Sequence, residues 1–220
     1  MCDYPVTGRN RIKRSPKRAR YDRETVFAIL DEGLICHVGL VEKGRAIVIP
    51  TLYARMGDRI LLHGSNGSRL MKHISLGNEV CITVTLVDAL VLARSVFHHS
   101  ANYRSVVLYG TGSAIEDEAQ RLHAMEALTQ HIVPGRWEDA RKPNAQELAA
   151  TTVVAITIES ASAKIRTGPP ADDEEDYDLP IWAGLLPLPP APQAPIPDPR
   201  LIEELSPPRY VTAYSRGAAG

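Results

Sequence analysis

Few cysteines and few large aromatic residues limit what this chain can be. Its 220 residues include three cysteines, two phenylalanines and two tryptophans. Three thiols cannot build the disulfide framework of a small secreted protein, and Cys36 and Cys81 lie in apolar segments. We therefore expect buried free thiols in a reducing compartment, and a core filled by Val, Ile, Leu and Ala.

The chain also lacks a long apolar segment and an excess of charge of one sign. No window approaches the ~18 apolar residues of a membrane-spanning helix, and no apolar signal segment is found at the N-terminus. The formal net charge is −1 at pH 7, which gives no whole-chain attraction to nucleic acid or to a membrane. We expect a cytoplasmic protein without a membrane partner.

Positive charge is concentrated in residues 1–20, where lysines and arginines follow Arg9 closely. Such a segment could contact nucleic acid, but no zinc-finger, helix-turn-helix or aromatic-repeat pattern accompanies it. We predict a basic N-terminal extension that lies on a partner subunit. A nucleic-acid-associated protein is the alternative.

Residues 21–168 have the pattern of one mainly β domain with short helices. Short Gly-containing turns join the first strands, which is typical of an antiparallel meander. No repeated βαβ unit and no complete G-x-G-x-x-G sequence is present, which argues against a Rossmann fold. Helices are predicted over 23–32, 68–75, 116–132 and 145–150, and strands over 34–41, 45–53, 59–63, 79–86, 89–97, 103–115, 151–159 and 161–167.

Residues 169–220 form an acidic and then Pro-rich tail that cannot build a core of its own. An apolar stretch at 179–187, which contains Trp182, interrupts it. An apolar stretch within a polar tail is expected to dock on the domain or on a partner subunit. Trp182 could cover a bound cofactor, seal a dimer or simply pack within the tail.

The segment from Ile60 to Lys72 has the pattern of a strand, a turn of small residues and the start of a helix. This geometry directs backbone N–H groups and the positive end of the helix dipole at one spot, which suits a phosphate. Ser65 and Ser68 add hydroxyl donors, and Arg69 adds a guanidinium. The simpler alternative is an ordinary turn with Ser68 as the N-cap.

Three stretches carry a resemblance to a known family: 45–51, 60–72 and 97–110. The chain resembles the pyridoxamine 5'-phosphate oxidase-related proteins, and most of all the branch of nitroimidazole-resistance and flavin-nucleotide-binding proteins. This resemblance implies a six-stranded antiparallel split β-barrel that binds FMN. It also implies a homodimer with the FMN at the subunit interface.

The resemblance implies roles for individual residues. Ser68 and Arg69 match the pair that holds the FMN phosphate, and the strand end at 63–65 matches contacts to the phosphate, ribityl chain or ring. The strand at 47–50 matches the one whose backbone faces the isoalloxazine. The predicted cofactor-binding residues are Ile47, Val48, Ile49, Pro50, His63, Gly64, Ser65, Ser68, Arg69, Ser105 at the position of a flavin-contacting glutamine, Arg104 on a polar rim, and Trp182.

Two departures limit the resemblance. Pro50 and Leu70 stand where the oxidases carry lysines, and the C-terminal Arg-x-His motif of those enzymes has no match. The chain is therefore not expected to oxidise pyridoxine phosphate.

We predict an oxidoreductase that passes hydride or electrons through FMN, from NAD(P)H or another reductant, to a small nitro-aromatic or quinone-like acceptor. No catalytic residue is predicted. A non-catalytic flavin carrier or sensor is the alternative. We predict no metal site at His98 and His99, because adjacent strand residues point to opposite faces; a haem ligand there is a further alternative.

Overall fold

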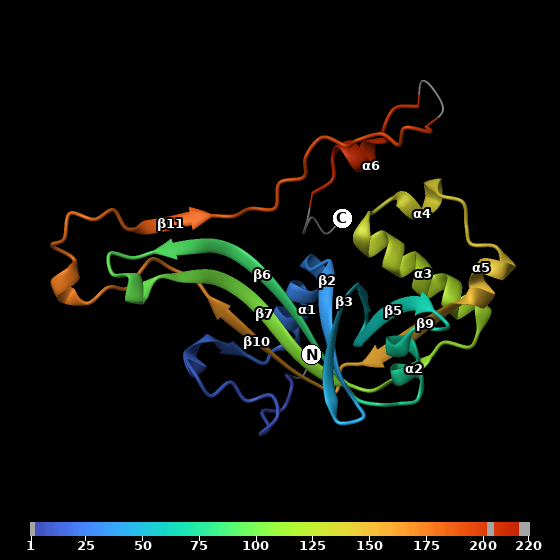
Figure 1. Cartoon of the computed structure of the whole chain (residues 1–220), viewed down its shortest axis with the longest axis horizontal. Helices are drawn as coiled ribbons and strands as arrows, with labels where there is room; N and C mark the ends of the chain where they lie inside the picture. Colours follow the sequence, from blue (N-terminus) through green and yellow to red (C-terminus); the bar gives the residue numbers. More distant parts are fainter. Residues whose placement is uncertain (1–2, 202–204, 216–220) are drawn as a thin grey trace.

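Two antiparallel sheets form the fold in a computed structural model that describes residues 3–201 and 205–215 (Figure 1). The strands are β1 (Ala19–Arg20), β2 (Ile35–Glu42), β3 (Arg45–Leu52), β4 (Ala54–Met56), β5 (Arg59–Ser65), β6 (Val80–Leu92), β7 (Ser100–Gly110), β8 (Gly112–Ala114), β9 (Thr151–Thr157), β10 (Ser160–Arg166) and β11 (Gly184–Pro187). The larger sheet has the order β1-β10-β7-β6-β2-β3, with β11 paired to β6, and the smaller has the order β4-β5-β9-β8. The mainly β class with antiparallel strands is confirmed.

Short helices cover the ends and one side of these sheets (Figure 1). The α-helices are α1 (Arg23–Glu32), α2 (Arg69–Ser75), α3 (Glu118–Ile132), α4 (Arg136–Asp139), α5 (Ala145–Ala150) and α6 (Arg209–Thr212), and the 3-10 helices are η1 (Pro16–Arg18), η2 (Val96–His98) and η3 (Glu174–Asp176). No helix in the described ranges is long and apolar enough to cross a membrane.

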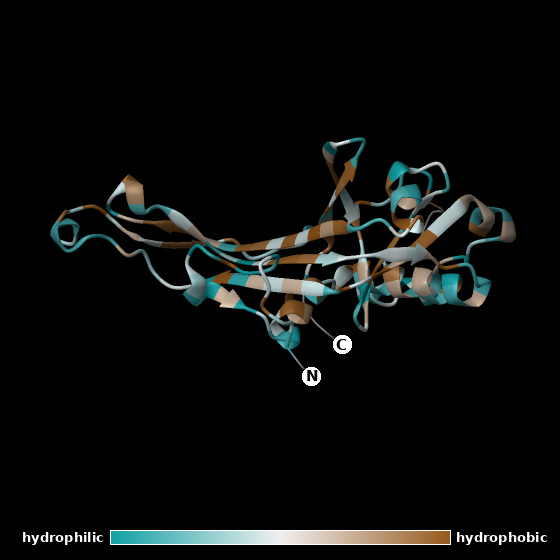
Figure 2. Cartoon of the chain, turned by 90° about the horizontal axis from the view of Figure 1, so that it is seen from below, coloured by the Kyte–Doolittle hydropathy of each residue, from teal (hydrophilic) through white to brown (hydrophobic). Residues whose placement is uncertain are grey.

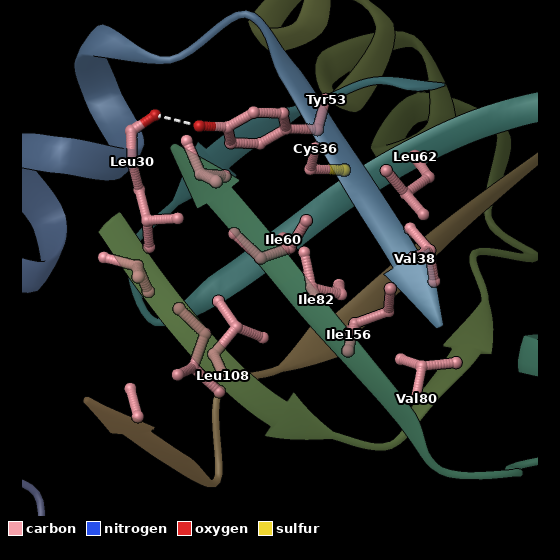
Figure 3. Close-up of a cluster of buried hydrophobic side chains, with 14 of the residues drawn as sticks. Leu30, Cys36, Val38, Tyr53, Ile60, Leu62, Val80, Ile82, Leu108 and Ile156 are labelled. Atoms are coloured by element: carbon pink, nitrogen blue, oxygen red, sulfur yellow. Dashed lines mark hydrogen bonds between the residues drawn. The ribbon is translucent and has the colours of Figure 1, made fainter. Parts of the chain in front are cut away.

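The main core lies between the two sheets (Figure 3). Val38, Ile82 and Leu108 of the larger sheet pack in one cluster with Ile60 and Ile156 of the smaller sheet. All five side chains are fully buried. Branched aliphatic side chains therefore fill this core, as the scarcity of aromatic residues predicts.

Helix α1 begins where the sequence predicts. The Asp22 carboxylate accepts a hydrogen bond from the Thr25 backbone N–H at 2.8 Å, which caps the first turn. At the other end, the Tyr53 hydroxyl donates to the Leu30 carbonyl oxygen at 2.5 Å (Figure 3). The helix is thus tied to the sheet through its last turn.

Two glycines take the chain from one sheet to the other. The sequence predicts one bent strand over 103–115, whereas the structure has β7 in the larger sheet and β8 in the smaller sheet. A Cβ atom at Gly110 would lie 1.9 Å from the Thr157 carbonyl oxygen, and one at Gly112 would lie 2.6 Å from that of Ala155. Only glycine fits at this crossing.

Strand β6 is longer than predicted. In place of the expected strands 79–86 and 89–97 there is one strand of 13 residues, with a shift of register between Val87 and Ala89. Residues 93–97 were wrongly predicted as strand, since β6 ends at Leu92 and η2 begins at Val96. Asp88 therefore marks a β-bulge and not a strand end. Beyond the bulge the β6–β7 hairpin leaves the rest of the molecule as a projection, residues 88–102, to which β11 is paired (Figure 1). We call residues 88–102 with β11 the arm.

Both ends of the described chain pack on the rest of the same chain. Tyr4 is buried, and the Asn10 side chain donates to the Ala161 carbonyl oxygen at 3.1 Å. The sequence predicts contact with a partner subunit for residues 1–20, but these contacts of residues 3–20 lie within one chain. In the tail, the apolar stretch docks through β11 on β6, and the Tyr210 hydroxyl donates to Asp139 at 2.6 Å.

Candidate functional site

The chain between β5 and α2 has the order that the sequence predicts, a strand, a turn of small residues and a helix start. The predicted free N–H groups are fewer than expected, because those of Asn66, Gly67, Ser68 and Met71 donate to acceptors within the protein. The Ser68 hydroxyl oxygen accepts from the Met71 backbone N–H at 3.5 Å, and the Ser65 hydroxyl oxygen accepts from the Gly67 N–H at 3.1 Å. Because both oxygens act as acceptors, their hydroxyl hydrogens remain donors. The simpler N-cap role of Ser68 is therefore present, and it is compatible with an anion contact.

Arg69 lies beside this turn and is held only loosely. Its nearest carboxylate is Glu42, at 3.7 Å, and both side chains are about half exposed. An ion pair of this kind contributes ~0–1 kcal/mol, so the guanidinium can exchange this partner for a phosphate at little cost.

A cavity of about 560 Å³ opens beside Arg69, between the β2–β3 hairpin and α2. Three cationic side chains, Lys43, Arg69 and Lys72, line it together with one carboxylate, that of Glu42. The excess of positive charge favours an anionic ligand. The other lining residues are Val41, Gly67, His73, Leu76 and Asn78.

The predicted flavin strand, β3, is the last strand of the larger sheet. Ile47 and Ile49 pack against the core, while Val48 and Pro50 are exposed on the other face. An edge strand has backbone groups without a strand partner, and proline is tolerated there because it has no N–H to donate. The backbone of this strand is therefore available to a ligand.

Ser105 lies on the same face of the larger sheet as Pro50. Pro50 is opposite His37, His37 is opposite Thr83, and Thr83 is opposite Val107. Ser105 is two residues from Val107 on β7, so its side chain is on the same face. This face is only half-buried at Thr83, Ser105 and Val107.

Arg104 points to the other face and is fully engaged. Its Nη2 donates to Asp88 at 2.7 Å and to Glu32 at 2.8 Å, Nε donates to Asp88, and Nη1 pairs with Glu32. These hydrogen bonds, first to Glu32 and then to Asp88, raise the pKa of Arg104 above its already high range. The partners of this predicted cofactor-binding residue are thus two carboxylates of the same chain.

Trp182 is 70% exposed and precedes β11 on the arm. The arm and α2 lie at opposite ends of the molecule (Figure 1). Trp182 is therefore remote from residues 63–69 of the same chain (Figure 1).

The histidines separate into two groups. Within the described residues, five of the seven contact a protein group: His73, His98, His99, His123 and His131. The other two are His37 and His63. The His63 side chain is exposed, but the surrounding protein partly desolvates its imidazole and lowers its pKa, so the ring is neutral at neutral pH.

His98 lies in η2 and not in a strand, 3.2 Å from Asp173. His98, Asp173 and Asp176 thus form a group at the end of the arm, in which one potential metal-ligand atom of each residue lies within 4.8 Å of the others. An imidazole paired with the exposed carboxylate of Asp173, beside the half-buried Asp176, explains this group without a metal.

The two thiols of the described residues, those of Cys36 and Cys81, carry no reactive signature, because burial raises the pKa of both. Cys36 is buried, which raises the pKa of its thiol to about 12.

The residues that sequence reasoning missed are Lys43 and Lys72. Each belongs to a recognised element, the 42–44 turn and the 68–75 helix, but the cavity that joins them arises only from the packing of one element on the other.

Comparison with known proteins gives a consistent result. A family model described as pyridoxamine 5'-phosphate oxidase matches residues 22–165. The flavocytochrome Anf3 from Azotobacter vinelandii is 42% identical over 95% of this chain and 97% of its own, with a TM-score of 0.87. A FAD and heme binding protein from Mycobacterium smegmatis is 34% identical over 89% of this chain and 96% of its own, with a TM-score of 0.84.

A candidate 5-nitroimidazole antibiotic resistance protein from Bacteroides thetaiotaomicron is 20% identical over 67% of this chain and 86% of its own, with a TM-score of 0.58, which supports the fold alone. Among curated protein sequences none matches the chain.

Proposed function

The chain belongs to the pyridoxamine 5'-phosphate oxidase family, and we propose that it is a flavin-dependent redox protein with its flavin phosphate at the β5–α2 turn. The observation that carries this proposal is the turn itself, where two serine hydroxyls and a loosely paired Arg69 stand beside a cationic cavity. FMN and FAD share the ribityl phosphate, so the placement applies to both.

The isoalloxazine would lie along β3. This strand leads away from the hairpin that borders the cavity, and its outer edge is free for backbone contacts at 47–50. When bound, the flavin supplies hydride and electron transfer. The protein's part is to hold the phosphate, to present backbone groups to the ring and to exclude water from it.

We propose a homodimer that completes this site. Figure 2 shows hydrophobic stretches that continue from the body into the arm. Exposed apolar side chains occur on the outer face of the larger sheet and on the arm, namely Ile35, Val41, Val48, Leu52, Val87, Val96, Phe97 and Trp182. A two-fold partner would cover such surface and could bring its Trp182 to the turn of the first protomer.

The proposed reaction is reduction of a small acceptor, nitro-aromatic or quinone-like, by NAD(P)H or another reductant. A reducing compartment such as the cytoplasm suits the free thiols Cys36 and Cys81. A flavin carrier without turnover would have the same binding site. Anaerobic reduction by NADPH and reoxidation by an acceptor separate the two, because only the enzyme gives repeated turnover.

The test of the site is flavin binding by the variant with Ser68→Ala and Arg69→Ala. Charge-assisted hydrogen bonds are worth about 1.5–3 kcal/mol each, so the variant should lose at least a hundredfold in flavin affinity, measured by fluorescence quenching. Arg141→Ala, which removes an exposed ion pair with Glu147, is the matched control. A double variant that purifies with full flavin content contradicts the placement.

A haem is a second candidate cofactor, because two solved structures at 42% and 34% identity are of a flavocytochrome and of a FAD and heme binding protein. His63 fits this role better than His98 or His99, since its neutral imidazole has no protein partner in the described chain, whereas the other two have one. Haem, when bound, supplies one-electron chemistry. His63→Ala should abolish the Soret band of the purified protein, and an unchanged band excludes His63 as the haem ligand.

A further inference from the structure

Positive charge is concentrated in residues 9–20, which hold seven lysines and arginines and no carboxylate. We call these residues the basic segment. Of the seven, Arg9 alone forms an ion pair in the described part of the chain, with Glu79. Strand β1 at the end of the segment is paired to β10, so the charges belong to a surface that is fixed to the domain. The exposed cations without an ion pair are Arg11, Lys13, Arg14, Lys17 and Arg20.

Arg166 of β10 adds a buried charge beside the basic segment. Its side chain is 8% exposed, and in the described chain no carboxylate pairs with it. Burial, and then the positive charge of Arg18, lower the pKa of Arg166. A buried cation without a counter-charge destabilises the fold, and a nearby anion offsets this cost. The guanidinium donates to the side-chain oxygen of Asn102, the last residue of the arm, so the basic segment adjoins the base of the arm.

Negative charge is concentrated at the other end of the arm. Residues 172–178 contain six carboxylates and no basic residue, and we call them the acidic tip. The Asp172 carboxylate accepts from the backbone N–H groups of Arg94 and Ser95, which fixes the tip on the arm. Asp173 lies 3.2 Å from His98. The carboxylates that form no ion pair in the described chain are those of Glu174, Glu175, Asp176 and Asp178.

The arm thus has opposite charges at its two ends and apolar surface between them (Figure 1). Leu90 and Leu186 are opposite each other in β6 and β11 and are 39% and 48% exposed. A two-fold axis that lays two arms antiparallel places each acidic tip beside the base of the other arm. The same rotation covers the apolar surface of both arms. Charge and apolar surface are therefore both complementary to a second copy of this chain.

We propose that the acidic tip of one protomer docks on the basic segment of a second copy, in both directions across a two-fold axis. The proposal rests on the homodimer of the proposed function and gives it a contact surface and an orientation of the arms. It also explains why the basic segment lies on its own chain and still presents unpaired charge. No residue of the two docking surfaces belongs to the proposed flavin site, so the two proposals can fail separately.

The experiment reverses the charge of each surface in turn and measures the dimer dissociation constant by sedimentation equilibrium. The basic-segment variant carries Lys13→Glu, Arg14→Glu and Lys17→Glu, and the tip variant carries Glu174→Lys, Glu175→Lys and Asp178→Lys; all six side chains are exposed. Each variant alone should dimerise at least about a hundredfold more weakly than the wild type, because like charges then face each other twice per dimer.

Mixing the two variants should restore dimerisation. In the mixed dimer both contacts again join opposite charges, so its dissociation constant should lie within about tenfold of that of the wild type. Recovery in the mixture also shows that both variants fold. The matched control makes the same change of net charge at the far end of the molecule, with Arg136→Glu, Arg141→Glu and Lys142→Glu, and should dimerise like the wild type (Figure 1).

The proposal is overturned if either variant alone dimerises like the wild type, or if the mixture is no tighter than its components. A monomeric wild type overturns it together with the homodimer. If that monomer binds a DNA oligonucleotide with a steep salt dependence, and the basic-segment variant does not, the basic segment serves nucleic acid instead. Flavin content, measured on the same samples, tests the flavin site independently of all these outcomes.

Discussion

The two halves of the β6–β7 hairpin share one ladder of strand pairs but differ in what covers their side chains. In the body half, Ile82 and Leu108 are opposite each other and fully buried between the sheets. In the arm half, Leu90 lies in the sheet between Ala101 of β7 and Leu186 of β11 and is 39% exposed. The same pair of strands therefore changes from a core element to a surface element at the bulge.

This difference separates stability from recognition. In the body half the inward face, which carries Ile82 and Leu108, is buried between the two sheets, so substitutions on that face are expected to act on folding. The arm half ends in Val96 and Phe97, each 86% exposed, and so has apolar surface that a single chain does not use. The arm is thus the part of the molecule suited to contact a second protomer.

The largest expected effect tests this difference within one strand. Ile82→Ala should lower the free energy of unfolding by about 2–5 kcal/mol, because it leaves a cavity in a fully buried position. Leu90→Ala should lower it by only about 1 kcal/mol, since much of that side chain is already in water. Urea unfolding at a protein concentration that gives monomers measures both; equal losses would contradict the comparison.

The sequence predicts the locally determined elements well. The helices predicted over 23–32 and 145–150 are present as α1 and α5, and Asp22 and Asn144 cap them through residues only three positions away. It fails at Asp88, which was expected to end a strand. A polar residue is tolerated inside β6 because Arg104, 16 residues further on, pairs with it across the hairpin.

In the candidate site, too, the features set by neighbouring residues in the sequence were predicted, and those set by long-range packing were not. The turn with Ser65 and Ser68 is continuous in sequence, and its order of elements was predicted. The cavity was not predicted, because it joins Lys43 and Lys72 from elements that only the folded chain brings together. Trp182 could not be placed either, since its docking depends on the pairing of β11 with the distant strand β6.

A smaller effect is expected at the junction of the two halves, where Arg104 pairs with Glu32 of α1 and Asp88 of the bulge. Arg104→Met keeps the aliphatic stem but leaves two half-buried carboxylates without their partner. Allowing for their partial exposure, we expect a loss of about 1–3 kcal/mol in urea unfolding. Arg141→Met removes an exposed pair and should cost less than about 1 kcal/mol; a similar loss in both variants would mean that Arg104 has no special role.

The smallest effect on global stability is expected from loss of a contact near the outer end of the arm. There the Asp172 carboxylate accepts hydrogen bonds from the backbone N–H groups of Arg94 and Ser95 at 3.0 and 3.1 Å. Burial alone would raise the pKa of Asp172, but these N–H groups and the Arg94 guanidinium together lower it below 3.8. The contact is therefore complete at neutral pH and is lost as the pH falls through this lowered pKa.

Hydrogen exchange, corrected for intrinsic rates, should show protected amides at Arg94 and Ser95 near neutral pH and a loss of protection below pH 3.8, while the Ile82 amide stays protected. Asp172→Asn should remove the pH dependence and weaken protection of the two arm amides at every pH, because the amide oxygen is a weaker acceptor than the carboxylate. If the Ile82 amide loses protection together with the Arg94 amide, the arm and the body unfold as one unit. That result would contradict the difference in stability between the two halves of the hairpin.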